Sequence, residues 1–197
     1  LKGRVAQGVF ESCCQGMTLA MLFAKPSLRT RFSFEVGMSQ LGGKAMYVNR
    51  QEIGLGEREA IKDVARVLSR FVEIVMIRHP KHADIVEFAK HASVPVINAL
   101  SDQEHPCQAL GDMLTIREVF GSGKRKVAFV GDANNVSASL GELCAMLGLR
   151  FAHAAPKGYA FRKPFVTRMK AMAKKAGGAF VVGHNPLTAV KGASVVY

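Results

Sequence analysis

The sequence predicts an α/β protein with two successive three-layer domains, each a parallel sheet covered by helices, the second of them incomplete. Short apolar runs alternate with segments of helical periodicity along the whole chain. The apolar runs are continuous rather than alternating, which is typical of parallel strands buried on both faces. The basic, glycine-containing stretch GSGKRK at 121–126 interrupts the rhythm. We therefore expect domains at 1–121 and 122–197.

The first half of the chain contains four strand–helix units. The expected strands are short apolar runs at 17–23, 45–49, 73–78 and 94–100. The expected helices are 27–41, ended by a Gly-Gly pair, and 59–71, 81–92 and 105–120. In the first helix we expect Phe32, Phe34 and Val36 to be buried. In the second, the expected apolar stripe is Ile61, Val64, Val67, Leu68 and Phe71.

The second half repeats the same alternation. Its expected strands are 126–132, 150–156, 179–183 and 194–197. Its expected helices are 135–149, 164–177 and a short one after 183. The chain starts without Met and stops inside an expected strand, so we expect a longer natural protein.

Composition excludes several classes of function. The net charge is +12, from 27 basic and 15 acidic residues, but the basic residues are scattered and their densest groups lack interleaved aromatics. Nucleic-acid binding is therefore not favoured, because base stacking needs an aromatic platform. No apolar run is long enough to span a bilayer, so we expect no membrane partner. The four cysteines form no CxxC pair and are interpreted as reduced thiols.

Ligands of parallel α/β sheets bind beyond the carboxyl ends of the strands. The stretch FAKPSLRTRFSFE, 23–35, occupies the first such corner. Ser27 is a good helix cap, and unpaired N–H groups at a helix start attract anions. Thr30 adds a hydroxyl, and Arg29 or Arg31 could add a guanidinium for phosphate. The alternative interpretation is a capped helix with two surface arginines.

Other corners also carry polar residues. Arg78 ends an expected strand and could project into the crevice or lie on the surface. His105 and Gln108 share a face at a helix start, where they could bind a carbonyl and an amide. No ligand set has usable spacing for a metal. FVGDANNV, 129–136, lacks GxGxxG, and its Asn134 and Asn135 could cap a helix or hold a polar substrate.

Three of these motifs together resemble a known family. KPSLRTR at 25–31, HPCQAL followed by D and LT at 105–115, and VGDANNV at 130–136 resemble the aspartate/ornithine carbamoyltransferases, most closely those that act on ornithine. The resemblance extends over DVARVLSR at 63–70, SVPVINAL at 93–100 and PKGY at 156–159. HPCQ followed by VGDANNV favours ornithine over aspartate as the acceptor.

The resemblance implies a reaction and its substrates. The amine of ornithine would attack the carbonyl carbon of carbamoyl phosphate, giving citrulline and phosphate for arginine biosynthesis. Residues 1–121 would bind carbamoyl phosphate and 122–197 ornithine. The resemblance further implies no metal or organic cofactor, a homotrimer, and a cytoplasmic location, or the plastid stroma if the source is a plant or alga.

The same resemblance implies roles for individual residues. The phosphate would be held by Ser27, Leu28 through its backbone, Arg29 and Thr30. The catalytic residues would be Arg78 and His105 at the carbonyl oxygen and Gln108 at the carbamoyl amide. These three would also belong to the carbamoyl phosphate site, and Asn135 would contact ornithine.

The sequence departs from the family pattern at two places. Gly54 stands where the family usually has a glutamine for carbamoyl phosphate, and Ala24 replaces a common glutamate, as in plant-type members. Family members also continue with a Ser-Met-Gly loop and a Cys-Leu-Pro segment, which are absent from these 197 residues. We therefore expect a complete donor half-site but an incomplete acceptor site. Another acceptor amine, such as aspartate, and a non-catalytic anion-binding relative remain alternatives.

Overall fold

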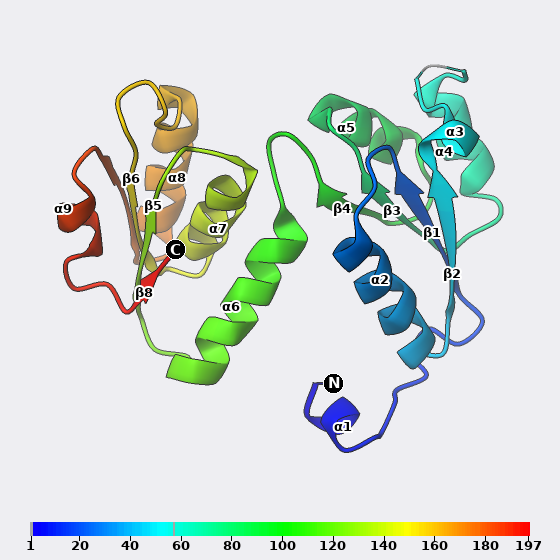
Figure 1. Cartoon of the computed structure of the whole chain (residues 1–197), viewed down its shortest axis with the longest axis horizontal. Coiled ribbons are helices and arrows are strands. Elements are labelled where there is room, and N and C mark those ends of the chain that lie inside the picture. The colour runs from blue at the N-terminus through cyan, green and yellow to red at the C-terminus, as the bar shows by residue number, and fades with distance from the viewer. Residues whose placement is uncertain (1, 57) are drawn as a thin grey trace. The chain divides into compact units, whose positions relative to one another are not determined.

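The computed structural model describes residues 2–56 and 58–197 (Figure 1). The chain divides into two compact units, Leu1–Asp102 and Gln103–Tyr197. The division precedes the helix Pro106–Phe120, whereas the boundary expected from the sequence follows it at residue 121. The domain boundaries and roles expected from the sequence stay predictions, and each unit is described by itself.

The first unit is built on a four-stranded parallel sheet with the order β2-β1-β3-β4. Its strands are β1 Thr18–Phe23, β2 Lys44–Asn49, β3 Ile74–Arg78 and β4 Val96–Leu100. Its helices are α1 Lys2–Ala6, α2 Leu28–Gln40, α3 Arg50–Ile53, α4 Ile61–Leu68 and α5 His82–His91. Phe23 at the end of β1 is in register with Asn49 of β2 and Arg78 of β3, so the three strands end together.

Both faces of this sheet are buried, which explains the continuous apolar runs. In β1, Leu19, Met21 and Phe23 belong to a core cluster with Met38 of α2. Alternate β1 residues pack on the opposite face, in a cluster that includes Ala65 of α4 and Phe88 of α5. The unit therefore has the three layers that the sequence predicts.

Two expectations about helix faces are wrong. In α4, the face formed by Val64, Ala65 and Leu68 packs on the core, and Val67 lies off that face and is 54% exposed. Phe71 follows the end of the helix at Leu68 and is 74% exposed. In α2, Phe32 and Val36 are 58% and 47% exposed, whereas Phe34 packs against the core. The physical reason is the helical period of 3.6 residues, which cannot place three alternate residues on one face.

The second unit contains a four-stranded parallel sheet with the order β7-β6-β5-β8. The strands are β5 Lys126–Val130, β6 Arg150–Ala154, β7 Ala179–Gly183 and β8 Val195–Val196. The helices are α6 Pro106–Phe120, α7 Asn135–Met146, α8 Lys163–Lys175 and α9 Pro186–Val190. Figure 1 shows α7 and α9 on opposite sides of this sheet. The predicted α/β class with two successive parallel-sheet units is thus confirmed.

The main core of the second unit lies on the α7 and α8 face of the sheet. It includes Phe151 of β6, Phe180 of β7, Leu140 of α7 and Met169 of α8. Cys144 is fully buried there, and burial raises the pKa of its thiol to about 12. All four cysteines are free thiols, as the sequence predicts.

The turns that follow α7 and α8 approach closely at Gly148. Its φ of +67° lies in the left-handed region, and a Cβ atom there would lie 2.2 Å from the carbonyl oxygen of Ala176. Since that neighbour is backbone, it can make room only if one turn shifts. Gly192 has a similar φ of +69°, but no atom of the described residues outside its own turn lies within 4 Å of the place that a Cβ atom would take. A comparison of the two positions therefore distinguishes the cost of a left-handed backbone, which both share, from the cost of a steric clash, which only Gly148 would have.

We expect Gly148→Ala to destabilise the chain more than Gly192→Ala. A left-handed alanine costs about 1–2 kcal/mol, which both variants share, and only Gly148→Ala adds the conflict with Ala176. Chemical denaturation of the two variants measures the difference. Equal losses of unfolding free energy would contradict the close approach of the two turns.

Candidate functional site

The first candidate corner joins β1 to α2. The N–H of Ala24, the first residue after β1, donates to the carbonyl of Arg78 at 3.0 Å. This bond continues the β1–β3 pairing by one step beyond Phe23 and Arg78. The residues that lead to α2 therefore start beside the carboxyl end of β3.

Ser27 is the N-cap of α2, as the sequence predicts. Its backbone is extended, with φ −158° and ψ 114°, and its Oγ accepts a long hydrogen bond from the N–H of Thr30 at 3.4 Å. The same hydroxyl donates to Oγ1 of Thr30 at 2.9 Å. The first N–H groups of a helix have no acceptor inside it, and the first turn of α2 contains no acidic residue. The helix start therefore favours an anion.

Arg29 and Arg78 bring two positive charges to this corner. Burial lowers the pKa of Arg78, and the positive charge of Arg29 lowers it further. Arg29 is exposed and Arg78 is half-buried. Among the residues that the structure describes, no group accepts a hydrogen bond from the buried Nε of Arg78. Because like charges repel at short range, an anion between them would relieve an unfavourable interaction.

Arg31 has a different environment. Its Nε donates to Glu35, one turn along α2, at 3.0 Å. Its guanidinium also lies 4.2 Å from the centroid of the Tyr47 ring on β2. The hydrogen bond to Glu35 is the main cause that raises the pKa of Arg31. Of the two arginines that the sequence left open for phosphate, Arg31 thus holds the helix against β2, and Arg29 is the candidate.

A cavity of about 270 Å³ lies beside Ala24 at the same edge of the sheet. Arg50, His79 and Lys81 are among the residues that line it. Nδ1 of His79 lies 3.4 Å from Oδ2 of Asp84, so the cavity also contains an acidic neighbour. None of these three basic residues was singled out from the sequence. They could have been found, since all follow directly after the ends of β2 and β3.

The local structure explains why position 54 is occupied by glycine in this chain. It ends α3 in the left-handed conformation, with φ +50° and ψ 33°. A Cβ atom there would lie 2.6 Å from Cβ of Arg58. The helix itself starts with a capping box between Asn49 and Glu52. A glutamine at position 54 would require this turn to be rebuilt.

His105 and Gln108 lie at the start of α6. His105 is the N-cap residue, its backbone N–H donates to Oγ of Ser139 at 2.8 Å, and Pro106 follows in the first turn. Nε2 of Gln108 donates to Oδ1 of Asp112, one turn along α6, at 2.9 Å. The bond to Asp112 must open before Gln108 can use that donor elsewhere. His105, by contrast, is anchored through its backbone.

The two asparagines of FVGDANNV have distinct positions. Asn134 is the N-cap of α7 and forms a capping box with Ser137, whereas Asn135 is the first residue of the helix. The preceding turn is tied to the PKGY corner, because the N–H of Ala133 donates to the carbonyl of Tyr159 at 2.8 Å. The expected capping role thus belongs to Asn134, and Asn135 begins the helix beside this corner.

The predicted residues fall into two groups. The structure brings together Ser27, Leu28, Arg29, Thr30 and Arg78 at one edge of the first unit. The second unit contains His105, Gln108 and Asn135. Their roles in binding or catalysis stay predictions.

Neither a metal-binding cluster nor a membrane-spanning helix is found in the described part of the chain. Across residues 2–56 and 58–197, no three His, Cys, Asp or Glu side chains are grouped so that they could hold a metal ion. In the same ranges, no helix combines the length and the apolar character needed to cross a membrane.

Both halves of the chain match models of one protein family. Residues 1–118 match the model described as aspartate/ornithine carbamoyltransferase, carbamoyl-P binding domain, and residues 123–197 match its Asp/Orn binding domain. The chain belongs to the aspartate/ornithine carbamoyltransferase family. The resemblance noted in the sequence is thereby confirmed.

Individual members of the family are similar over most of this chain. Ornithine carbamoyltransferase from Methanopyrus kandleri is 53% identical over 93% of the chain, and that from Bacillus subtilis is 44% identical over 99%. The chain spans only 59% and 61% of those two proteins. The solved structure of ornithine carbamoyltransferase from Pyrococcus furiosus matches the whole chain with a TM-score of 0.96 and 46% identity, and the chain covers 63% of it.

We expect Arg29→Gln to weaken the binding of inorganic phosphate by roughly tenfold or more, since a hydrogen bond to a charged group is typically worth about 1.5–3 kcal/mol. Arg31→Gln is the matched control, because it removes the same charge two residues away but its partners are Glu35 and Tyr47. Isothermal titration calorimetry measures both. Equal weakening by the two variants would show that net charge alone attracts phosphate.

Proposed function

We propose that the protein transfers the carbamoyl group of carbamoyl phosphate to the side-chain amine of L-ornithine, giving L-citrulline and phosphate in arginine biosynthesis. The observation that carries this proposal is the Arg29–Arg78 pair of cations at the capped start of α2. The identity of 53% to an ornithine carbamoyltransferase supports ornithine as the acceptor.

The donor is bound through its phosphate. The hydroxyls of Ser27 and Thr30, the N–H of Leu28 and the guanidinium of Arg29 surround the phosphate oxygens at the positive end of α2. Binding here neutralises the repulsion between Arg29 and Arg78. It also stabilises the phosphate dianion as it leaves, since its charge grows when the bond to the carbonyl carbon breaks.

The transfer itself requires charge stabilisation at the carbonyl. The neutral amine of ornithine attacks the carbonyl carbon, and negative charge develops on the carbonyl oxygen. Arg78 and His105 donate to that oxygen, and Gln108 binds the carbamoyl amide. The tetrahedral intermediate then expels phosphate, and the nitrogen loses a proton. Donors that act on charge present only in the transition state lower the barrier.

The two parts of the chain have complementary roles in this proposal. Residues 1–121 bind carbamoyl phosphate, and residues 122–197 contribute Asn135 to the ornithine site. The descriptions of the two matching family models support this division. The family resemblance alone supports a homotrimer in the cytoplasm, or in the plastid stroma if the source is a plant or alga. The proposed reaction uses no metal or organic cofactor.

A second candidate function is that of a non-catalytic anion-binding relative. Gly54 favours it, because the turn that ends α3 leaves no room for the glutamine common in the family. Such a protein would bind phosphate at α2 without transferring a carbamoyl group.

An acceptor panel separates these candidates. We expect the full-length protein to form citrulline from carbamoyl phosphate and ornithine, and no carbamoyl product from aspartate. The 197-residue chain alone should lack full activity, because its acceptor site is expected to be incomplete. Arg78→Gln should lower kcat by about 10²–10³, the usual effect of losing one donor to a developing oxyanion. Arg31→Gln is the control and should retain kcat.

The other outcomes of this panel identify the alternatives. A carbamoylated aspartate would replace the proposed acceptor. Phosphate binding that is sensitive to Arg29→Gln, without any carbamoylated product, would support the non-catalytic relative.

A further inference from the structure

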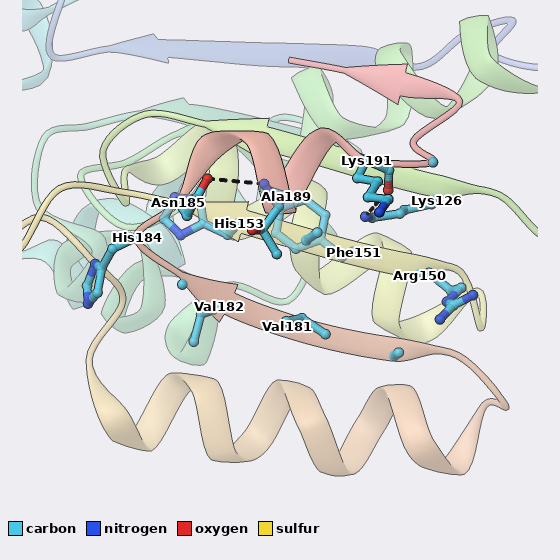
Figure 2. A pocket seen from close by; sticks show the side chains of 15 residues that line it. Lys126, Arg150, Phe151, His153, Val181, Val182, His184, Asn185, Ala189 and Lys191 are labelled. Carbon is cyan, nitrogen blue, oxygen red and sulfur yellow. Dashed lines mark hydrogen bonds between the residues drawn. The ribbon is translucent and has the colours of Figure 1, made fainter.

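A groove of about 510 Å³ lies between α9 and the β6–β7 edge of the second sheet (Figure 2). The volume is within the range of ligand sites in proteins, which are mostly apolar with a few placed polar groups. The groove lies on the α9 face of the sheet, whereas Asn135 begins α7 on the opposite face. It is therefore separate from the residues to which the proposed transfer reaction assigns a role.

The register of the strands explains why the groove exists. On the α7 face, β6 and β7 direct Phe151 and Phe180 into the main core. The alternate residues of β6 and β7, which face α9, are small or lie at the rim of the groove. Among them, Ala152 is in register with Val181. Helix α9 has only five residues and covers part of this face through Ala189. An apolar floor therefore remains open, and Val181 is 57% exposed on it.

One end of the groove is basic. Lys126 of β5 and Arg150 of β6 are in register, so their side chains start from neighbouring positions on the same face. Nζ of Lys126 donates to the carbonyl of Lys191 at 2.6 Å, which brings the start of the turn after α9 to the same end. Figure 2 shows Lys126, Arg150 and Lys191 together at this end. None of the described residues that line the groove is acidic.

The opposite end offers less charge. Nδ1 of His184 forms a hydrogen bond with the carbonyl of Ala155 at 2.8 Å, and Oδ1 of Asn185 accepts from the N–H of Thr188 at 3.2 Å. These polar groups are used by the local structure. The groove thus has an apolar floor, a basic end and a mostly satisfied polar end.

We propose that this groove binds a small amphipathic anion. An acyl or aryl body lies on Ala152, Val181 and Ala189, and a carboxylate or phosphate head lies at the basic end. Three cations are complementary to such a head, since no described residue that lines the groove is acidic, and a guanidinium can bind either group in a bidentate manner. The apolar floor favours a ligand with an apolar body, which inorganic phosphate does not have.

The test uses four probes that separate head from body. Octanoate and octyl phosphate carry both parts, 1-octanol carries the body alone, and inorganic phosphate carries the head alone. We expect both amphipathic anions to bind the 197-residue chain at least tenfold more tightly than 1-octanol. Added salt should weaken their binding, because the basic end is exposed. Amide chemical shifts of the labelled chain report where each probe binds.

Two variants and two controls assign the parts of the groove. Arg150→Gln should weaken octanoate binding by about tenfold, and Lys175→Gln, the same charge change at the end of α8 outside the groove, should not. Val181→Asn should weaken octanoate binding but leave inorganic phosphate unaffected. Arg29→Gln should leave octanoate binding unchanged, so this test is independent of the proposed transfer reaction.

Several results would overturn the proposal. They are equal affinity for 1-octanol and octanoate, equal effects of Arg150→Gln and Lys175→Gln, or no shifts in β6, β7 and α9 at millimolar octanoate. A longer form of the protein in which its own chain fills the groove and octanoate no longer binds would overturn it as well.

Discussion

The parallel pairing of β1 with β3 is the constraint on which the corner between β1 and α2 depends. It aligns Phe23 with Arg78 and is extended by the bond from Ala24 N–H to the Arg78 carbonyl. Since the strands end together, the chain leaves β1 beside Arg78 and starts α2 only four residues later, at the Ser27 cap. Arg29, in the first turn of α2, is therefore brought within electrostatic reach of Arg78. Core packing on both faces of the sheet holds this alignment.

Arg29 and Arg78 bring two like charges to this corner, and an anion bound there would offset their repulsion. Burial and the Arg29 charge both lower the pKa of Arg78, so the folded chain bears the cost of holding two like charges together. Arg31 illustrates the ordinary solution to the same problem, because it is paired with Glu35 and lies over Tyr47. This contrast between two arginines in one helical turn is the reason that we propose Arg29, and not Arg31, as the phosphate-binding group.

Much of the fold could be predicted because continuous apolar runs and helical periodicity are local signals. The order of strands and helices followed from them, while the Ser27 cap followed from its residue type and the free thiols from the spacing of the cysteines. The exposure of Phe32 and Val36 did not, since it depends on the direction of each helical face toward the sheet. Helix α3 was missed although Asn49 and Glu52 carry a capping signal, because the helix has only four residues. The basic groove was missed because Lys126, Arg150 and Lys191 are brought together by strand register and a tertiary hydrogen bond.

We propose that Arg29 and Arg78 are coupled through a shared anion. A double-mutant cycle with Arg29→Gln and Arg78→Gln, measured by denaturation with and without inorganic phosphate, tests it most directly. We expect a repulsive coupling without phosphate, so that the double variant loses more stability than the sum of the two single losses. Saturating phosphate should reverse the sign of the coupling. A coupling that is absent in both conditions, or unchanged by phosphate, would show that the two arginines do not share an anion.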